Sequence, residues 1–425
     1  MHAPTEAQSR KAVTAAVIGN VLEWYDFAVY GYVATIISKQ FFAPGDEVAA
    51  LLATFATFGL GFLARPLGGI IIGWIGDTKG RKTALILTIM LMAIGTVMIG
   101  LIPSYATIGV LAPLLLLVAR LMQGFSAGGE WGGSTAFIVE WAPEGKRGYY
   151  GSFQQMSVVA GLLLGSGMAA LLSTVLSTEA MEGWGWRVLF LIGGLLGPVG
   201  MWMRRNIDET PAYRAVANET AVSTAPAAPA VSPLMLAAKA FGFTVLWTVS
   251  FYIFLAYMPT FTQRYVGLTR ATALWSNTAG LFLLMIAIPF FGSLSDRVGR
   301  KPLLLACCIA FIVLPYPVFA LMLGGAPLPV VIAIQLLIGL TIALFSGPGP
   351  AAIAEIFPTR TRSTYMSTGY SLAVAIFGGF APFIATWLIG LTGSPISPVY
   401  YVIACAAVSA AVIWSLRETA HEKLG

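Results

Sequence analysis

Five charged side chains lie within long apolar stretches of this chain. They are three acids and two bases: Glu23, Asp26, Glu130, Arg65 and Arg120. A charge at the centre of a lipid bilayer costs roughly 3 kcal/mol, so each of these groups needs a partner or a function. Paired with one another they leave one surplus acid, which could be carried as a proton. The residue types therefore indicate proton binding and release beside a buried cation.

The stretches that hold these charges are long enough to cross a membrane. Hydrophobic residues make up 58% of the chain and charged residues 10%, and the mean hydropathy is +0.83. This composition excludes a soluble globular domain and predicts an all-α integral membrane protein. A span needs about 20 apolar residues, and about twelve such stretches are predicted. They are residues 13–37, 51–75, 83–102, 108–139, 151–174, 188–203, 240–262, 272–294, 303–323, 329–354, 364–390 and 399–416.

The basic residues between the spans predict the orientation. With the N-terminus inside, only Lys39, Arg187, Arg264 and Arg270 fall outside. This asymmetry predicts that both termini are cytoplasmic. The net charge of +6 is then an effect of topology and gives no reason to expect nucleic-acid binding. The polar first residues have no cleavage site before the first long span, which predicts that no signal peptide is removed.

Two charged motifs each occur twice in the chain. G-x-x-x-D-x-x-G-R-K spans residues 73–82 and 292–301, and E-x-x-P-x-x-x-R spans residues 140–147 and 355–362. The copies are 219 and 215 residues apart, so the chain is a duplication. We expect an N-terminal six-helix bundle over residues 1–203, a cytoplasmic linker over 204–239 and a C-terminal six-helix bundle over 240–425.

The motif G-x-x-x-D-x-x-G-R-K contains more than basic residues. Basic residues that only fix the orientation in the membrane would explain its Lys and Arg, but not its regularly spaced Asp and Gly. Gly80 and Gly299 permit backbone angles that other residues adopt at a cost. Asp77 and Asp296 can accept hydrogen bonds from the N-terminus of a neighbouring helix. The motif therefore predicts a tight hairpin that contacts another helix.

These paired motifs, half a chain apart, resemble the signature of the major facilitator superfamily over nearly the whole chain. The resemblance implies that two halves rock about a central site. It also implies that the hairpins lock the cytoplasmic face, so their loss should slow conformational exchange more than it weakens binding. The implied gate residues are Asp77, Gly80, Arg81, Glu140, Arg147, Asp296, Arg300, Glu355 and Arg362.

The same resemblance places the first and fourth helices of each half at the central cavity. Asp26 and Arg120 are then expected to face each other there. A proton on Asp26 or Glu23 would release Arg120 to bind an anionic substrate, and loss of the substrate would let the ion pair re-form. A static ion pair between two helices is the alternative. Glu130 is also a candidate for proton coupling, although for Glu130 and Arg65 a structural role has equal weight.

Polar and aromatic residues of both halves are candidates for substrate contact. Packing is the commoner role of such aromatic residues. The position equivalent to Arg120, 215 residues later, is the neutral Gln335. The candidates are Arg120, Arg65, Tyr25, Tyr30, Gln154, Gln155, Trp247, Tyr252, Asn277, Gln335 and Tyr370.

Longer stretches of the sequence resemble one particular family within this superfamily. G-N-V-L-E-W-Y-D-F-A-V-Y-G-Y, F-L-A-R-P-L-G-G and R-L-M-Q-G-F-S-A-G-G-E-W-G-G together resemble the metabolite:proton symporter family of bacterial inner membranes. Its members take up citrate, tricarballylate, 2-oxoglutarate, shikimate, or proline and betaine. The stretch I-F-G-G-F-A-P-F-I-A-T-W-L-I-G-L-T-G is most similar to citrate and tricarballylate carriers. Osmoprotectant carriers usually add a long C-terminal coiled coil, whereas this chain stops soon after Arg417.

The expected function is import of a di- or tricarboxylate with protons by alternating access. Alternatives are transport of shikimate, proline or betaine, exchange of organic anions, or a sensor derived from a transporter. We do not expect an enzyme or an ATP-driven transporter, because the chain has no G-x-x-x-x-G-K-[ST] loop to hold a nucleotide. A metal site is not expected either, because the two histidines, His2 and His421, lie in the tails. We expect a monomer in the bilayer whose partners are its substrate and protons, with no other cofactor.

Overall fold

The computed structural model describes most of the chain between residues 20 and 422. The described ranges are 20–21, 23–79, 81–128, 131, 135, 138–139, 142–143, 145–205, 233–357 and 362–422. Gly80, Glu130 and Glu140 lie outside them. For Asp77, Arg81 and Arg362 the backbone is described but not the side chain. The proposed linker boundaries at 203 and 240 stay a prediction.

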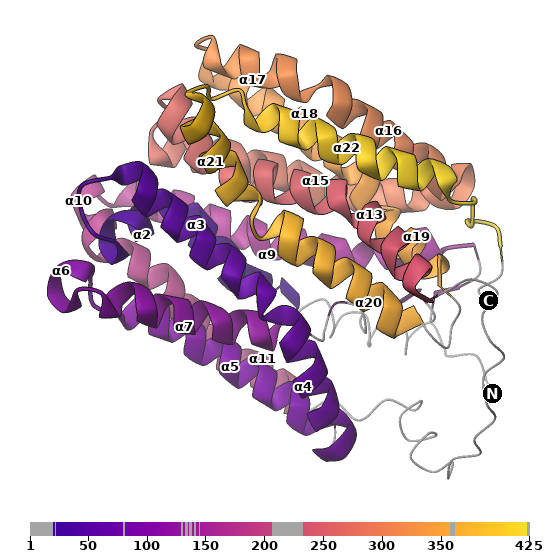
Figure 1. The fold of residues 1–425 in the computed structure, drawn as a ribbon, viewed down its shortest axis with the longest axis horizontal. Coiled ribbons are helices and arrows are strands. Elements are labelled where there is room, and N and C mark those ends of the chain that lie inside the picture. Colours follow the sequence, from indigo (N-terminus) through magenta and orange to yellow (C-terminus); the bar gives the residue numbers. More distant parts are fainter. Residues whose placement is uncertain are drawn as a thin grey trace.

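Helices alone make up the regular structure of the described residues (Figure 1). Residues 23–32 are helical and lead into α2. The first half continues with α2 (Ala34–Phe41), α3 (Glu47–Leu63), α4 (Arg65–Lys79), α5 (Arg81–Leu101), α6 (Tyr105–Ile108), α7 (Leu111–Ser126), α9 (Arg147–Val175), α10 (Thr178–Ala180), the π-helix η1 (Met181–Gly185) and α11 (Trp186–Arg205).

The second half has the same kind of architecture. Its elements are α13 (Pro233–Phe251), η2 (Tyr252–Tyr257), α14 (Met258–Phe261), η3 (Thr262–Val266), α15 (Arg270–Val298), α16 (Arg300–Val313), α17 (Pro315–Leu323), α18 (Leu328–Ser346), α19 (Gly349–Glu355), α20 (Arg362–Ala373), η4 (Val374–Gly378), α21 (Ala381–Thr392) and α22 (Pro398–Ser415).

Seven helical segments of the described chain are long and apolar enough to cross a membrane, or eight if one bent pair counts as a span. Several of the predicted spans comprise more than one of these elements. A turn at Ala64 separates α3 from α4 within the apolar helical segment Glu47–Ile72, which covers most of the span predicted at 51–75. The span predicted at 303–323 bends by 41° between α16 and α17. Pro315 begins α17, and its missing N–H and bulky ring explain why the helix bends there.

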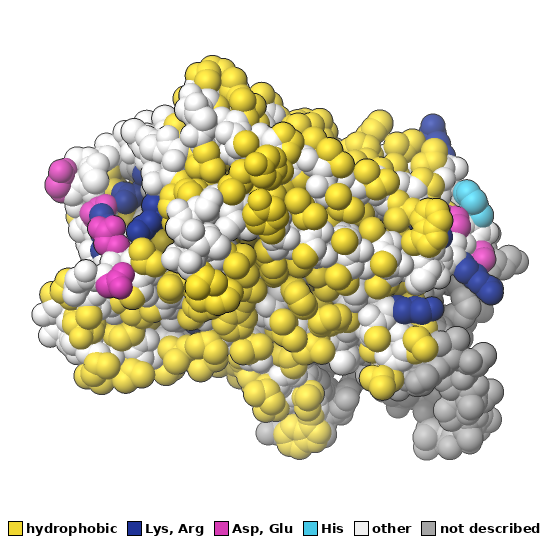
Figure 2. All heavy atoms as spheres, turned by 45° about the horizontal axis from the view of Figure 1, so that its top comes forward, with side chains coloured by type: hydrophobic (Ala, Val, Ile, Leu, Met, Phe, Trp, Pro, Cys, Tyr) yellow, Lys and Arg dark blue, Asp and Glu magenta, His cyan; other side chains and the backbone are white. Residues whose placement is uncertain are grey.

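The surface matches a membrane environment. Figure 2 shows hydrophobic side chains over the middle of the molecule and charged side chains gathered at its two ends. Leucine, isoleucine, valine and tryptophan side chains are exposed on many of the helices. A lipid bilayer has a hydrocarbon core about 30 Å thick that accepts such a surface.

The duplication seen in the sequence is repeated in the packing. In the first half, α3 and α7 cross where Gly61 meets Gly124, and a Cβ on Gly124 would lie 1.6 Å from the Gly61 carbonyl oxygen. In the second half, α15 and α18 cross where Gly280 meets Gly339, and a Cβ on Gly339 would lie 2.7 Å from the Gly280 carbonyl oxygen. These four residues are related by the same two offsets as the motifs. Small residues let the backbones of membrane helices approach closely.

The two halves are packed against each other along their length. α9 of the first half lies beside α15 of the second, and α3 lies beside α21 and η4 (Figure 1). Ser166 on α9 and Thr278 on α15 are hydrogen-bonded at 2.8 Å. The central site therefore lies between two closely apposed halves.

We predict that Gly124→Ala and Gly339→Ala both destabilise the protein, because each added methyl group would meet a backbone oxygen. Overpacking of this kind costs about 1–3 kcal/mol. The measurement is thermal unfolding of the purified protein in detergent. Gly390→Ala is the control, since its nearest neighbour would be a Val48 methyl group at 3.8 Å. An unchanged melting temperature for both variants would contradict this account of the crossings.

Candidate functional site

Asp26 and Arg120 are joined by a chain of hydrogen bonds and not by the direct ion pair that the sequence suggested. Arg120 Nη1 donates to Gln123 Oε1 at 2.8 Å, Gln123 Nε2 donates to Thr96 Oγ1 at 2.8 Å, and Thr96 Oγ1 donates to Asp26 Oδ2 at 2.9 Å. All four residues are buried, and Arg120 has no exposed surface. Two polar side chains lie between the charges, so the cation and the anion are linked at a distance.

This four-residue network is supplied by three elements. Asp26 lies in the helical residues 23–32, Thr96 in α5, and Arg120 and Gln123 in α7. Positions three apart on a helix lie on the same face, which explains why Gln123 meets the Arg120 side chain. The sequence analysis missed Thr96 and Gln123. The available signal was their polarity within apolar spans and the position of Gln123 one turn after Arg120.

Both ends of the network keep unused hydrogen-bonding capacity. Asp26 Oδ1 and the Nε and Nη2 atoms of Arg120 have no hydrogen-bond partner among the described residues. A buried polar atom without a partner costs about 1–3 kcal/mol. The unused carboxylate oxygen could hold a proton, and the unused guanidinium N–H groups could bind a carboxylate.

Arg65 and Arg120 both lie against aromatic rings. The Arg120 guanidinium carbon lies 4.5–5.0 Å from the ring centroids of Phe27, Tyr30 and Phe58. The Arg65 guanidinium carbon lies 4.4–5.4 Å from those of Trp24, Phe27 and Phe62. Aromatic faces stabilise a cation by about 2 kcal/mol where water is excluded. Arg65 Nε and Nη2 also have no hydrogen-bond partner in the described part of the chain.

A small cavity lies between the halves next to Arg65. It is lined by Trp24, Gln155 and Val158 of the first half and by Trp247, Thr248, Phe251, Tyr252 and Tyr370 of the second. Its volume is about 10 Å³, which is the space for a single water molecule. Trp131 and Tyr370 stack across the interface with ring centroids 3.4 Å apart. The site is therefore closed in this conformation.

Charges of both signs lie close to this cavity. Arg65 and Glu23 are both near enough to Tyr252 and to Tyr370 for electrostatic interaction with their hydroxyl groups. Arg65 also lies over the Trp24 ring, which lines the cavity. A base, Arg65, and an acid, Glu23, therefore both lie near the aromatic residues Tyr252 and Tyr370 of the cavity lining.

The other predicted contact residues are divided between this site and the surrounding helices. Gln155, Trp247, Tyr252 and Tyr370 line the cavity. Several others are directed elsewhere: Tyr25 donates to the Leu189 carbonyl at 3.0 Å, and Asn277 donates to Ser166 Oγ and to the Leu255 carbonyl. Tyr30 donates to the Thr54 carbonyl at 2.9 Å while its ring faces Arg120. The side chains of Gln154 and Gln335 are buried away from the cavity lining.

At the cytoplasmic end, the second hairpin motif contacts the first half. Asp296 accepts hydrogen bonds from the backbone N–H groups of Gly148 and Tyr149, at 2.8 and 2.9 Å, in the first turn of α9. The sequence predicted such a contact between a motif aspartate and a helix N-terminus. Arg300 also donates to Asp296, at 2.8 Å. Gly299 has φ = 100°, the left-handed region expected of the motif glycine.

A buried cluster of charges joins the two halves at the same end. Arg147 of α9 pairs with Glu355 of α19 at 3.0 Å, and Arg300 pairs with the same carboxylate oxygen at 3.3 Å. Arg147, Asp296, Arg300 and Glu355 are thus brought together as the proposed gate. The matching cluster built on Asp77, Gly80, Arg81, Glu140 and Arg362 lies outside the described side chains.

Residues 416–422, here called the C-terminal strap, complete this cluster. Glu418 accepts hydrogen bonds from the backbone N–H groups of Arg300 and Lys301, both at 2.9 Å. Thr419 donates to Glu355 at 2.6 Å. Arg147 of the first half donates to the Glu422 carbonyl oxygen. The strap therefore binds both halves across the cytoplasmic face, a contact that the sequence analysis did not predict.

The opposite end of the molecule is also held closed. Glu182 of the first half accepts from Lys39 at 3.1 Å and from Arg270 of the second half at 2.9 Å. Burial opposes its ionisation, but these two cations outweigh burial and lower the pKa of Glu182 below its ordinary value. With ion pairs at both ends, the conformation is an occluded one.

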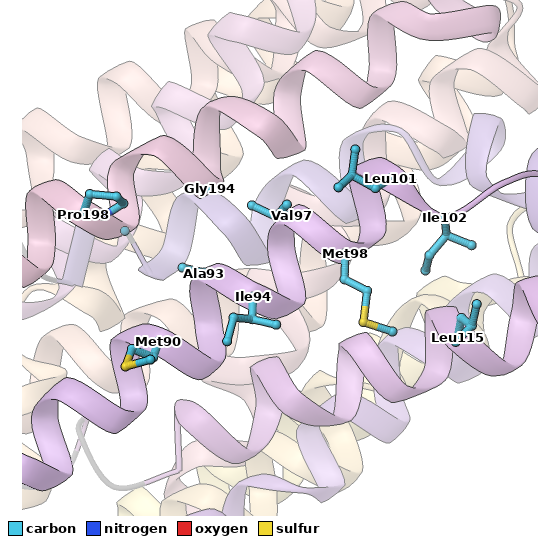
Figure 3. Close-up of a pocket in the computed structure, with 11 residues that line it drawn as sticks. Met90, Ala93, Ile94, Val97, Met98, Leu101, Ile102, Leu115, Gly194 and Pro198 are labelled. Carbon is cyan, nitrogen blue, oxygen red and sulfur yellow. The ribbon is translucent and has the colours of Figure 1, made fainter.

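A second hollow is a groove of about 670 Å³ between α5, α7 and α11, on the outer face of the first half. Figure 3 shows Met90, Ile94, Val97 and Met98 of α5 along it and Pro198 of α11 on the other side. Its eleven lining residues are all apolar or glycine. The groove therefore offers no group that could orient a polar metabolite.

We predict that Glu418→Gln opens the cytoplasmic end more often, because a neutral amide caps α16 more weakly than a carboxylate. Loss of a cap costs about 1 kcal/mol, equivalent to a shift of about five-fold in population. The measurement is labelling of a cysteine introduced at the buried Ser295 by a water-soluble thiol reagent. The native Cys307, Cys308 and Cys405 are buried.

Glu422→Gln is the matched control, because the strap contacts of Glu422 are made by its backbone: its carbonyl accepts from Arg147 and its N–H donates to the Thr419 carbonyl. Burial raises the pKa of Glu418, but backbone hydrogen bonds outweigh burial, so the pKa lies below its ordinary value. The cap is therefore intact above the ordinary glutamate pKa and is lost as the pH falls through the lowered value. Equal labelling of the Glu418 and Glu422 variants would contradict the strap as part of the gate.

Comparison with known sequences identifies the family. The sequence matches the family Sugar (and other) transporter over residues 11–227 and the Major Facilitator Superfamily over residues 249–425. A proline/betaine transporter of Salmonella typhimurium is 35% identical over 99% of this chain and 85% of its own length. The glycine betaine/proline/ectoine/pipecolic acid transporter OusA of Dickeya dadantii is 34% identical with the same coverage. These comparisons do not support the expected likeness to citrate and tricarballylate carriers.

Solved structures share the fold. A partially occluded, inward-open form of the xylose transporter XylE from E. coli has a TM-score of 0.77 at 18% identity, over 97% of this chain and 98% of that one. The proton:xylose symporter XylE bound to 6-bromo-6-deoxy-D-glucose has a TM-score of 0.77 at 16% identity, over 99% and 98%. The chain is therefore a multi-pass inner-membrane transporter, not an enzyme, with the all-helical, two-bundle fold expected from its sequence, and it belongs to the major facilitator superfamily.

Proposed function

We propose that this transporter imports a small zwitterionic carboxylate of the proline or betaine type together with protons, by alternating access. The observation that carries the proposal is that Arg65 and Glu23 both lie near Tyr252 and Tyr370, two aromatic residues that line the cavity between the halves. A zwitterion brings a carboxylate for the arginine and a cationic group for the acid and the rings. The names of the relatives, which are proline and betaine transporters, support the same class.

A tricarboxylate suits this site less well. It would bring three negative charges to two buried arginines, in a region that also holds the acids Glu23 and Asp26. Each uncompensated charge in a dry site is costly. The zwitterion therefore replaces citrate as the substrate class that we propose.

The hydrogen-bonded network suggests how a proton is coupled to the substrate. Every bond in it runs from the Arg120 cation toward the Asp26 anion, so the charges at the two ends strengthen the bonds between them. Protonation of Asp26 at its unused oxygen would remove the anion and weaken the whole chain. Arg120 would then be available to a substrate carboxylate, and release of the substrate would restore the network and favour loss of the proton.

Uptake of labelled glycine betaine, proline and citrate into proteoliposomes tests the substrate class. We predict that the two zwitterions accumulate when an inward proton gradient is imposed and that a protonophore abolishes the accumulation. Citrate should not accumulate. Accumulation of citrate alone would overturn the zwitterion proposal in favour of the carboxylate reading of the sequence.

We predict that Asp26→Asn keeps substrate exchange but loses proton-driven accumulation, and that Arg120→Ala loses both. The amide cannot gain and lose the proton, whereas the arginine is needed in every state of the cycle. Exchange and accumulation are measured in the same vesicle preparation. Normal accumulation by Asp26→Asn would remove Asp26 from the coupling step.

Thr96→Val tests the intermediate link in the network. The valine cannot connect Gln123 to Asp26, so proton-driven accumulation should fall while exchange is retained. Thr341→Val is the control, because the Thr341 hydroxyl donates only to Leu337 of its own helix. Equal accumulation by the two variants would show that the charges communicate without this hydrogen-bonded path.

A further inference from the structure

Five aromatic rings line the central cavity between the halves. Trp24 comes from the first half, and Trp247, Phe251, Tyr252 and Tyr370 come from the second. Neighbouring rings are steeply inclined: Trp247 to Tyr370 at 71°, Trp24 to Phe251 at 71° and Phe251 to Tyr252 at 67°. Their centroids are 5.8–6.1 Å apart. Rings inclined in this way can present several faces to one common space, which parallel stacked rings cannot do.

The position of the Trp247 ring is fixed from two directions. Its Nε1 donates to Ser346 Oγ at 3.0 Å, so the indole N–H is used outside the cavity. Gly349 of α19 lies against the same ring, where a Cβ would be 3.0 Å away. Trp247 thus offers the cavity its apolar ring and not its hydrogen-bond donor.

We propose that these five rings form an aromatic box for the alkylated ammonium group of the substrate and make the transporter selective for quaternary ammonium compounds. This inference rests on the proposed function, because it assigns the cationic end of the same zwitterion. A quaternary ammonium group has no N–H and cannot form hydrogen bonds. Its diffuse positive charge is held by aromatic faces, most strongly where water is excluded.

The polar atoms around the box are few. Gln155 Oε1, Thr248 Oγ1 and Tyr252 Oη lie at the cavity without hydrogen-bond partners among the described residues. A secondary ammonium group such as that of proline has two N–H groups and depends on such acceptors. A trimethylated ammonium group depends on the rings. The two kinds of substrate therefore use different side chains of one cavity.

The rings of the box come from both halves. Trp24 is contributed across the interface, and Trp131 of the first half covers Tyr370 from the same side. In this closed conformation the space between the rings holds a single water molecule. An alkylated ammonium group is larger than water, so the rings must separate to admit it, and the box binds the group in a less tightly closed conformation.

The test compares glycine betaine and proline uptake by Tyr370→Leu and Trp247→Leu with uptake by the ring-preserving variants Tyr370→Phe and Trp247→Phe. Loss of one ring face should raise the KM for betaine by about ten-fold or more. The KM for proline should change by less than about three-fold. The two phenylalanine variants keep a ring and should therefore retain most of the betaine affinity that the leucine variants lose.

Each outcome separates the two proposals. If the unmodified protein takes up neither compound, the proposed function fails. If it takes up both and the leucine variants lose both equally, or lose neither, the aromatic box fails while the proposed function stands. A second measurement needs no variant: tetramethylammonium, which has no carboxylate, should inhibit proline uptake competitively. Absence of inhibition at concentrations that saturate betaine competition would overturn the box.

Discussion

The structure depends on keeping Arg120 charged in a place that water does not reach. Its guanidinium group lies on three aromatic rings and donates to one amide, and the nearest compensating anion, Asp26, is reached only through two more hydrogen bonds. A direct buried ion pair would be stiff and costly to separate. A chain with two neutral members is easier to break and re-form, because each step exchanges one hydrogen bond. The close crossing of α3 and α7 at Gly61 and Gly124 keeps the helix that carries this arginine against its neighbour.

The two halves began as copies and now differ in chemistry. At the central site the first half carries the buried charges, whereas the position equivalent to Arg120 in the second half is the neutral Gln335. The second half contributes four of the five rings at the cavity. On the proposed function, the charged groups of the first bundle and the rings of the second therefore act on one substrate at the interface between them. Because the glycine crossings are alike in both halves, this difference was reached without changing the scaffold.

Repeats and hydropathy predicted the helical two-bundle architecture, since membrane insertion depends on features that are local in the sequence. The motif G-x-x-x-D-x-x-G-R-K predicted the hydrogen bonds between Asp296 and the N-terminus of a neighbouring helix. The bend before Pro315 was not predicted, because hydropathy is continuous across it. The links through Thr96 and Gln123 join separate helices whose relative rotation is set by packing. The relatives favour the proline and betaine alternative over the expected citrate. The sequence could not choose between them, because the choice depends on which side chains meet at one cavity.

The C-terminal strap carries a mechanical consequence. Its contacts reach α16 and α19 in one half and α9 in the other. A force applied to residues 416–422 would therefore act on the gate residues of both halves. A partner, scaffold or fusion attached there would act as a load on the transport cycle. The same attachment on the opposite face of the protein would not act on the strap contacts. A displacement of residues 416–422 would therefore act on α9, α16 and α19 together.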